Sequence, residues 1–501
     1  MLPVDRLMSM TPRDPLRTAL RHGLTAVAAA LIAGLPPTAV PASERIELPD
    51  IGTSARGVLS TQRELAIGEA FVRALRKEAA IVEDPEVETY LQGLGQRLVA
   101  QTDDATQRFS FFVVQDPRIN AFAAPGGYIG VHSGLVLATE SESELAAVLA
   151  HEIAHVTQGH IARRFEAASN MTIPTLAALA AAVLLASQSG QAGAAAIAAA
   201  QAGAMQFQID FTRANESEAD RVGIQALAGA GFDPRSMPTF FERLQKSVQY
   251  ARRPPEFLST HPVTESRIAD SLGRAEQYPY RQTSDSLAFQ LVRAKLRVLS
   301  AEDPVQVQRD FERMLASSPS PSQKAGRYGH ALALKRSGKP EQALTEMRAL
   351  SQAEPSNTAL LAERALLEQA AGQTGKALEL FRDGLAIYPQ DRILTFRYAE
   401  TLLAAGRPRE ARDALVAYGR DREPGPNYYR LLARSQELAG NLVEAHLAMA
   451  EYQYLMGQTE QAVQQLERAR REVRDDFYAA SRIDARLAPL KEELALLKAR
   501  R

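Results

Sequence analysis

Hydrophobic residues recur with two different spacings along the chain. Between residues 62 and 101 they follow the spacing of an α-helix, whereas Phe109–Val114 and Tyr128–Val131 are short apolar runs of the kind that form strands. Helical spacing returns after the second run, and from about residue 290 it continues towards the C-terminus. The pattern therefore predicts an α+β fold that is predominantly helical, with a mixed part followed by an all-α part.

The all-α part is an internal repeat. Glycine recurs every 34 residues, alanine follows each glycine five positions later, and proline follows two of the alanines after twelve more. The positions are Gly338, Gly372, Gly406, Gly440, Ala343, Ala377, Ala411, Ala445, Pro355 and Pro389. This pattern is typical of tetratricopeptide (TPR) repeats, which stack into a solenoid. A further pair, Gly457 and Ala462, comes only 17 residues after Gly440, which predicts a helix shared between two units.

The N-terminus has the features of a signal peptide. Arg13, Arg17 and Arg21 form a basic region ahead of the apolar run Leu24–Leu35, and small residues at positions 40–42 offer a cleavage point before Ser43. The run has about 12 residues, short of the roughly 20 that a membrane-spanning helix needs. The pattern predicts export with removal of residues 1–42; an uncleaved membrane anchor is the alternative.

Composition narrows the possible chemistry. The 501 residues include no cysteine, which excludes disulfides, thiol catalysis and cysteine ligands to a metal. The formal net charge is −1, so nucleic acid is not expected as a partner. Hydrophobic residues make up 46% of the chain and charged residues 23%, which is ordinary for a globular protein of two or three domains.

Two histidines with metal-binding spacing lie in a predicted helix. Ser141 and Glu144 have the spacing of a capping box, so the helix is expected to begin just after Ser141. On it, His151 and His155 are one turn apart and can bind one zinc ion together. Glu152, between them, can act as the catalytic base that takes a proton from an activated water. The motif alone is only moderately specific, because it also occurs by chance on surface helices.

A third ligand is expected from a second helix, 61 residues after His155, which Asn215 is expected to cap. Glu216 and Asp220 are four residues apart and share one face of that helix. Glu216 would complete a site of two histidines and one glutamate. Asp220 is placed to accept the other ring N–H of a ligand histidine, and so to support catalysis. Glu218 lies on the opposite face and is expected to point to solvent.

Four segments resemble one family of metallopeptidases. They are Asn120–Gly127, His151–Gln158, Asn215–Gly223 and the stretch from Arg253-Pro254-Pro255 to Thr260-His261-Pro262. These segments resemble the gluzincin family of HtpX heat-shock proteases and CAAX prenyl proteases, and above all its periplasmic subgroup of β-barrel assembly-enhancing proteases. In that subgroup too, a protease domain precedes TPR repeats. The resemblance extends over essentially the whole mature chain.

The resemblance implies a zincin-like metalloprotease domain with one Zn²⁺ per chain. It implies a periplasmic zinc endopeptidase and chaperone that degrades unfolded or misassembled outer-membrane β-barrel proteins, with the TPR solenoid docked on the β-barrel assembly machinery. A chaperone or adaptor with a latent metal site is the alternative. The expected segments are a signal peptide (1–42), a metalloprotease domain (43–275), a linker (276–290) and a TPR domain (291–501).

The resemblance also implies two further roles near the metal. A strand beside the zinc helix, formed by Gly127, Tyr128, Ile129 and Gly130, would pair with extended substrate through main-chain hydrogen bonds; a structural hairpin is the alternative. His261 would occupy the fourth zinc position and hold the protease latent; an incidental histidine beside a capped helix start is the alternative.

An apolar segment and one further histidine belong to none of these motifs. Residues 175–206 are rich in alanine and leucine but are interrupted by Ser187–Gln191, and their longest apolar stretch, Leu176–Ala186, is too short to span a bilayer. Two short helices are expected here; peripheral contact with a membrane, or a mobile lid, is the alternative. His160 follows His155 by five residues, which places it off the ligand face of a continuous helix, and it is expected to be structural.

Overall fold

The computed structural model describes residues 60–104, 107–166, 213–248, 255–281, 283–317, 323–420, 424–473 and 476–498, with a few isolated positions. The predicted signal peptide lies outside the described residues, as does the stretch 176–186 apart from Ala177. The described residues from 60 onward belong to one compact unit. None of the helices in these ranges is long and apolar enough to cross a membrane.

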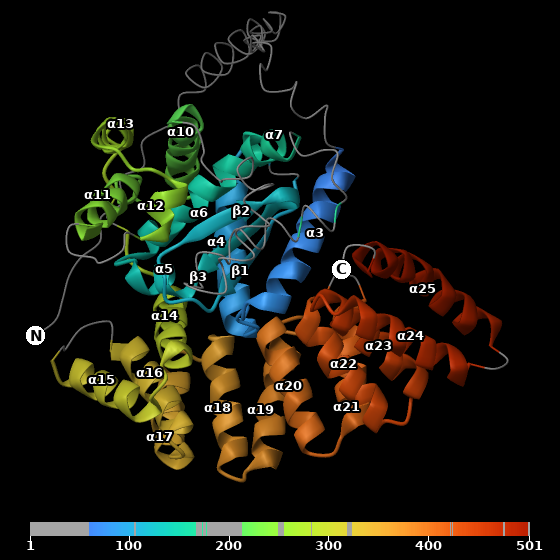
Figure 1. Cartoon of the computed structure of the whole chain (residues 1–501). Helices are drawn as coiled ribbons and strands as arrows, with labels where there is room; N and C mark the ends of the chain where they lie inside the picture. Colours follow the sequence, from blue (N-terminus) through green and yellow to red (C-terminus); the bar gives the residue numbers. More distant parts are fainter. Residues whose placement is uncertain are drawn as a thin grey trace, which may run out of the picture. The chain divides into compact units, whose positions relative to one another are not determined.

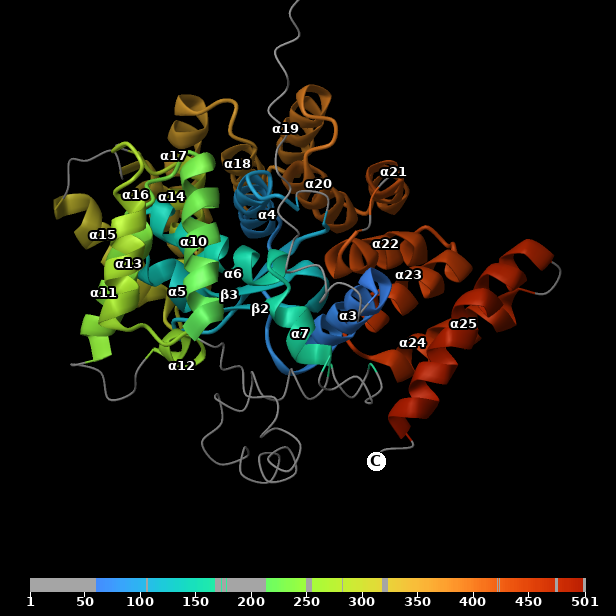
Figure 2. The ribbon, with the colours of Figure 1, turned by 90° about the horizontal axis from the view of Figure 1, so that it is seen from above.

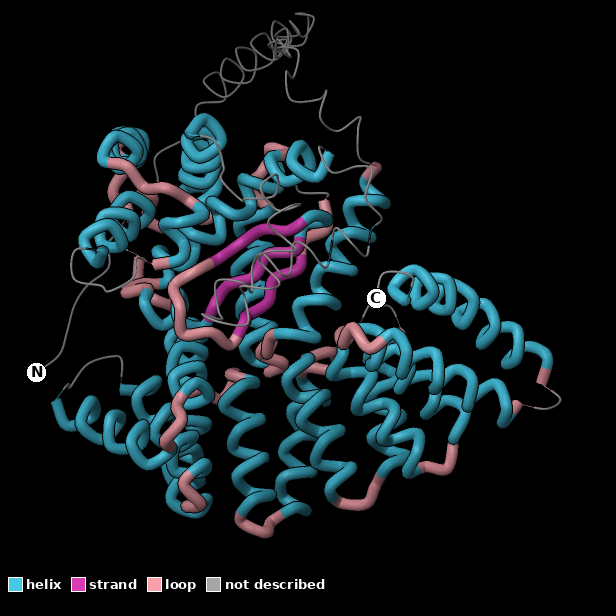
Figure 3. Tube along the Cα trace, in the orientation of Figure 1, coloured by secondary structure: helices cyan, strands magenta, loops and turns pink. Residues whose placement is uncertain are grey.

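A three-stranded sheet forms the centre of the protease part (Figure 3). Its strands are β1 (Ser110–Val114), β2 (Ala121–Ala124) and β3 (Tyr128–His132), in the order β1-β3-β2. The central strand β3 runs parallel to β1 and antiparallel to β2. The tight turn η1 (Pro125–Gly127) joins β2 to β3, and its two glycines have positive φ, which other residues rarely adopt. The two predicted strands are confirmed as β1 and β3.

Helices surround this sheet (Figure 1). They are α3 (Thr61–Glu78), α4 (Pro85–Val99), α5 (Ser133–Ala138), α6 (Glu142–Thr157), α7 (His160–Glu166), α10 (Arg213–Gly229), α11 (Ser236–Val248), α12 (Glu256–Thr260) and α13 (Glu265–Ala275). Every residue of α6 is buried, because α4, α10, α11 and strand β2 all pack against it. A helix enclosed on all sides can carry apolar residues around its whole circumference, as α6 does except for its histidines, its acidic positions, Ser143 and Thr157.

The C-terminal part consists of paired helices, which confirms the predicted fold class. They are α15 (Pro304–Ser317), α16 (Gln323–Arg336), α17 (Pro340–Ala353), α18 (Thr358–Ala370), α19 (Thr374–Ile387), α20 (Arg392–Ala404), α21 (Pro408–Gly419), α22 (Pro426–Leu438), α23 (Leu442–Leu455), α24 (Thr459–Glu472) and α25 (Phe477–Lys498). The repeated glycines all lie at helix ends with positive φ, and the repeated alanines are buried. Helix α23 lies between Gly440 and Gly457 and packs on both α22 and α24, as expected for a shared helix.

Helix α14 (Leu287–Ser300) belongs to both parts of the molecule. Its residues Phe289 and Leu296 pack in the core of the protease part. Its residues Leu291 and Val298 pack in the first core of the TPR array. The described residues just before it are also bonded to the protease part, since Ser286 donates from its N–H and its hydroxyl to the carboxylate of Glu142 at the start of α6. The stretch predicted as a linker therefore holds the two parts together.

A group of charged side chains, four of them buried and two partly exposed, lies where α4 meets α14 and the TPR helices. We call it the junction cluster, and it consists of Asp84, Glu86, Lys295, Lys335, Glu363 and Arg397. Asp84 also caps α4, because its carboxylate accepts from the backbone N–H groups of Glu86 and Val87. Helix α4 packs on α6 with one side and on α20 with another, so it stands between the TPR array and the helix that carries the paired histidines (Figure 2).

Candidate metal centre

Helix α6 begins where the sequence predicted. The Ser141 hydroxyl accepts from the N–H of Glu144 at 3.3 Å. The carboxylate of Glu144 accepts from the N–H of Glu140 at 2.6 Å, one residue earlier than an ideal capping box would have it. Arg243, on α11, donates to both oxygens of the same carboxylate at 2.6 Å each. The start of α6 is thus fixed to a neighbouring helix, which sets the position of the residues that follow.

Helix α10 approaches the backbone of α6 closely because of a glycine. A Cβ atom at Gly223 would lie 3.2 Å from the carbonyl carbon of Ala150 and 3.2 Å from the nitrogen of His151, so a larger residue would push the helices apart. Glu216 and Asp220 lie seven and three residues earlier on α10 and are buried with it against α6. The predicted cap at Asn215 is wrong, since α10 already begins at Arg213.

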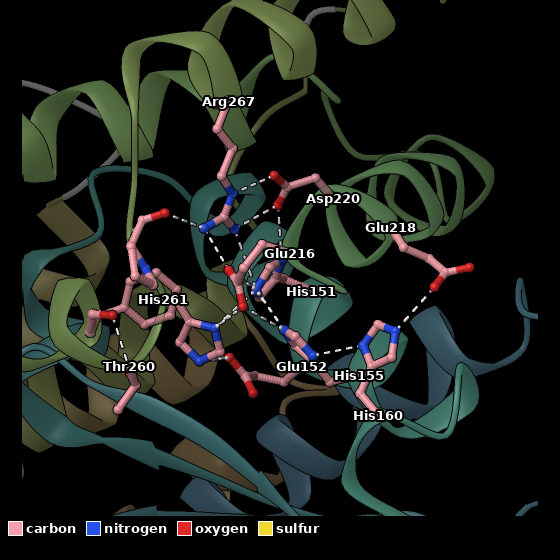
Figure 4. A network of polar contacts seen from close by, with 12 residues as sticks. His151, Glu152, His155, His160, Glu216, Glu218, Asp220, Thr260, His261 and Arg267 are labelled. Atoms are coloured by element: carbon pink, nitrogen blue, oxygen red, sulfur yellow. Dashed lines mark hydrogen bonds and ion pairs between the residues drawn. The ribbon is translucent and has the colours of Figure 1, made fainter. Parts of the chain in front are cut away.

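Four side chains from three places in the chain bring ligand atoms together (Figure 4). One nitrogen or oxygen each from His151, His155, Glu216 and His261 lies within 4.8 Å of every other. The Nε2 atoms of His151 and His155 are 3.1 Å apart. Nδ1 of His261 is 3.0 Å from Oε1 of Glu216 and 3.3 Å from Nε2 of His151. All four residues are almost completely buried, with exposed fractions of at most 2%.

Asp220 and Arg267 contact His151 and Glu216 on the side away from the converging ligand atoms. Oδ1 of Asp220 is 2.9 Å from Nδ1 of His151, the ring nitrogen that faces away from the other ligand atoms. Arg267, on α13, donates to Asp220 through Nε at 2.5 Å and through Nη2 at 2.9 Å, and its Nη1 is 2.5 Å from Oε2 of Glu216. Arg267 carries no sequence motif that would mark it, although it lies six residues after His261 in a helix capped by Thr264.

The charges of this site do not balance without a cation. We call the group of His151, Glu152, His155, Glu216, Asp220, His261 and Arg267 the metal-site cluster. It contains three buried carboxylates and one buried guanidinium, an excess of two negative charges when the histidines are neutral. Both carboxylate oxygens of Glu152 are buried without a hydrogen-bond partner. A buried excess of this size is costly unless it is compensated, and a divalent cation supplies the missing charge.

Burial and hydrogen bonds change the protonation of His151, His155 and Glu152. Burial lowers the pKa of His155 well below its usual value, so its ring is neutral and offers a lone pair. Burial also disfavours the charged form of His151, but hydrogen bonds to Asp220 and Glu216 outweigh it and raise its pKa to about 9. Without a metal, His151 therefore carries a proton that offsets one of the two excess negative charges, and a bound cation would displace that proton. Burial likewise raises the pKa of Glu152, which moves this carboxyl towards neutral pH. Two imidazoles and a carboxylate at one point are the donor set of a catalytic zinc site.

Two residues near the site make contacts that the sequence did not predict. Glu218 is partly directed to solvent, as predicted, since its side chain is 40% exposed, but its Oε2 also lies 3.1 Å from Nε2 of His160. The other ring nitrogen of His160, Nδ1, lies 2.9 Å from Nδ1 of His155. His160 reaches this position because α6 ends at Thr157, so the assumption of a continuous helix did not apply.

The predicted substrate strand needs a correction. Gly127 lies in the turn η1, and Tyr128, Ile129 and Gly130 lie in β3. Both edges of β3 are already paired, one with β1 and the other with β2, so its main chain is not available to a substrate. In the described part of the chain β2 pairs only with β3, and β2 packs against α6. Next to α6, β2 is therefore the strand with an edge that no other described strand pairs with.

His261 follows α12, whose last residue is Thr260. Its ring stacks on Phe257 of the same helix, with ring centroids 4.8 Å apart, and its Nε2 lies 3.4 Å from Oε1 of Glu152. The backbone N–H of Phe257 donates to the carbonyl of Ile119, just before β2, at 3.1 Å. The structure thus brings His261 to the point where the other three ligand atoms meet.

Comparison with known proteins agrees with this geometry. Residues 85–275 match the model of peptidase family M48, and residues 368–435 match a tetratricopeptide repeat model. The β-barrel assembly-enhancing protease of Escherichia coli K12 is 36% identical over 89% of this chain and 91% of its own length. A Vibrio cholerae protein assigned provisionally to the same group is 40% identical over 90% of this chain and 94% of its own length. The mitochondrial metalloendopeptidase OMA1 of Schizosaccharomyces pombe is 32% identical over 36% of this chain and 50% of its own length.

The sheet, the buried histidine pair and the glutamate on α10 define a metalloprotease of the M48 type, joined here to TPR repeats. Within that class, the chain belongs to the family of β-barrel assembly-enhancing proteases, to whose members it is similar over about nine tenths of its length.

Proposed function

We propose that the chain is a zinc endopeptidase in which His151, His155 and Glu216 hold the metal. The convergence of these side chains on one buried point carries the proposal. Bound zinc would acidify a water molecule and polarise the scissile carbonyl, which is what peptide hydrolysis at neutral pH needs. Asp220 holds the ring of His151 through Nδ1 and so leaves Nε2 directed at the metal position.

Glu152 acts as the general base. Its carboxylate is buried next to the ligand atoms and has no hydrogen-bond partner that would compete for a proton. Because burial raises its pKa, the carboxyl can accept a proton from the attacking water and give it to the leaving amine in the same cycle. Asp220 cannot take this role, since Arg267 and His151 already bind it.

Strand β2 receives the substrate. An edge strand offers main-chain donors and acceptors that an extended peptide can pair with, largely without regard to side chains. Such pairing suits unfolded or misassembled substrates, which expose extended segments. The names of the relatives and the TPR repeats of this chain support periplasmic substrates of the outer-membrane β-barrel class and a TPR-mediated contact with the barrel assembly machinery.

His261 keeps the protease latent. With its ring at the common point of the other ligands and 3.4 Å from Glu152, it fills the position that water or substrate needs. Removal of the ring opens that position without touching the three other ligands. A chaperone that keeps this site closed is the second candidate function, and the closed arrangement of His261 is the observation that favours it.

Glu152→Gln tests the proteolytic mechanism. We expect the variant to bind Zn²⁺ and to lose proteolysis of an unfolded outer-membrane protein by roughly 10²- to 10⁴-fold, the usual contribution of a general base. Glu242→Gln, which changes a half-exposed carboxylate in a surface ion pair of α11, is the matched control. Wild-type degradation by Glu152→Gln would contradict the mechanism. If the variant also rescues a barrel-assembly defect as well as wild type does, the chaperone function is supported.

His261→Ala tests the latch. We expect faster proteolysis than in the wild type, because the fourth position becomes open while Glu152 and the three ligands remain. His330→Ala, which removes a histidine bonded to Glu346 in the TPR array, controls for the loss of a histidine in general. Unchanged or slower proteolysis by His261→Ala would show that His261 is not inhibitory.

A further inference from the structure

We propose that His160 and Glu218 form a hydrogen-bonded relay that fixes the tautomer of His155 and so positions it as a metal ligand. This inference rests on the proposed metal site and adds two positioning residues to it. The three side chains come from three helices, since His155 lies on α6, His160 on α7 and Glu218 on α10. Figure 4 shows them in a row that leads away from the ligand atoms.

The relay uses the ring nitrogen of His155 that the metal does not need. Nε2 of His155 lies among the ligand atoms, 3.3 Å from Oε1 of Glu216. Nδ1 of His155 lies on the other side of the ring, 2.9 Å from Nδ1 of His160. Nε2 of His160 is in turn 3.1 Å from Oε2 of Glu218. Both histidine side chains are fully buried, whereas Glu218 reaches the surface.

The direction of each hydrogen bond follows from the last member. An ionised carboxylate can only accept, so Glu218 takes the Nε2–H of His160. In a neutral imidazole the second nitrogen is then an acceptor, so Nδ1 of His160 accepts a hydrogen bond. Its donor is Nδ1–H of His155, and with the proton on that nitrogen the lone pair of His155 is on Nε2. The relay therefore sets the tautomer that a metal at Nε2 requires.

The chain is folded to make this contact. After α6 ends at Thr157, Gly159 adopts a positive φ of 68° and turns the chain, so that α7 begins at His160 next to the helix it has just left. Helix α10 serves both ligand histidines with opposite faces, since Asp220 faces His151 and Glu218 faces His160. His151 thus has a direct carboxylate partner, while His155 has one at the end of a relay.

Three substitutions of His160 separate a relay from mere packing. Asn places its amide oxygen near the position of Nδ1 and can still accept from His155, Gln places its amide near Nε2 and cannot, and Ala does neither. We measure Zn²⁺ affinity of the full chain by competition with a chelator. For Gln and Ala we expect affinity to fall roughly 10- to 100-fold, the usual effect of removing such a partner, and for Asn we expect affinity close to wild type.

Glu218→Ala provides a second, surface test that leaves the core intact. We expect a smaller loss of Zn²⁺ affinity, because His160 remains in place but both of its tautomers become possible. In the His160→Asn background, Glu218→Ala should have no further effect, because the link to His155 no longer passes through an imidazole. Independent, additive losses would point to two unrelated effects and would overturn the relay.

The controls repeat the same chemical changes away from the metal. His330→Gln alters a histidine–glutamate pair in the TPR array, and Glu242→Ala removes a half-exposed, ion-paired carboxylate. Both should bind Zn²⁺ like wild type. If His160→Asn, His160→Gln and His160→Ala also bind like wild type, or if all three are equally weak, the relay is wrong while the metal site stands. A wild-type chain that binds no Zn²⁺ would overturn the proposed function itself.

Discussion

Two clusters of largely buried charged residues differ in whether their charges balance within the protein. The junction cluster contains three carboxylates and three cationic side chains, so its charges balance. The metal-site cluster contains three carboxylates and only one guanidinium. Burial alone therefore does not mark a functional site. The excess of negative charge, together with lone pairs that converge on one point, distinguishes the metal site from the junction.

In the junction cluster each charge has partners within the protein. Nζ of Lys295 lies 3.3 Å from Asp84, 2.5 Å from Glu86 and 3.0 Å from Glu363. Each of these carboxylates has another donor as well, and these donors are Arg397, Tyr328 and Lys335 respectively. Burial works against the charged form of Lys295, but the surrounding carboxylates outweigh it and raise its pKa well above the usual value. The cluster thus stabilises one arrangement of α4, α14 and the TPR helices.

Lys295→Met should have the largest effect on stability. The change leaves three buried carboxylates without their common cation, and removal of one partner from such a network costs about 3–5 kcal/mol. Urea unfolding with and without added Zn²⁺ measures the loss, which should be the same in both conditions. Lys491→Met, at a half-exposed ion pair with Glu467, should cost at most about 1 kcal/mol. A loss at Lys295 that depends on Zn²⁺ would contradict the separation of the two clusters.

Removal of the metal should destabilise the protein somewhat less. Zn²⁺ bound to the folded chain stabilises it by about 2.7 kcal/mol when its free concentration is a hundred times its dissociation constant. Chelation removes that contribution and leaves part of the excess negative charge of the metal-site cluster buried, since His151 takes up one compensating proton. Thermal unfolding with chelator and with Zn²⁺ measures the difference, and Glu216→Gln should reduce it. An equal transition temperature in both conditions would show that the metal-site cluster is as self-sufficient as the junction.

Periodic features of the molecule could be predicted from the sequence, because they repeat a local rule. Gly338 and its counterparts adopt positive φ at helix ends, and the alanines that follow them are buried where helices pack, as the 34-residue period implied. The same holds for His151 and His155, whose side chains meet because one helical turn separates them. Glu216 was found because its segment also carries a helical pattern.

Contacts that depend on where a chain reverses could not be predicted in this way. His160 is not among the converging ligand atoms, as expected, but its contact with His155 depends on the end of α6 at Thr157. Strand β3 was predicted to bind substrate because the sequence does not show the order of the strands in the sheet. In the structure β2 folds back and pairs with β3, which leaves β3 in the centre. Arg267 follows His261 closely in sequence, yet its role depends on how α13 packs against α10.

The smallest effect expected concerns Glu152, and it has the opposite sign. Both of its oxygens are buried without a hydrogen-bond partner, and an unpaired buried polar group costs about 1–3 kcal/mol. Without metal, Glu152→Gln replaces the charge by a neutral amide of the same shape, so we expect a gain of about 1 kcal/mol in the free energy of unfolding. The same substitution strongly lowers proteolysis in our proposal, so stability and activity should change in opposite directions.

In the junction cluster Glu363→Gln should lower stability, because that carboxylate is bound by Lys295 and Lys335. Urea unfolding of the chelated proteins measures both free energies of unfolding. If both substitutions lowered this free energy, Glu152 would have to be paired in the same way as Glu363, which would contradict the difference proposed between the two clusters.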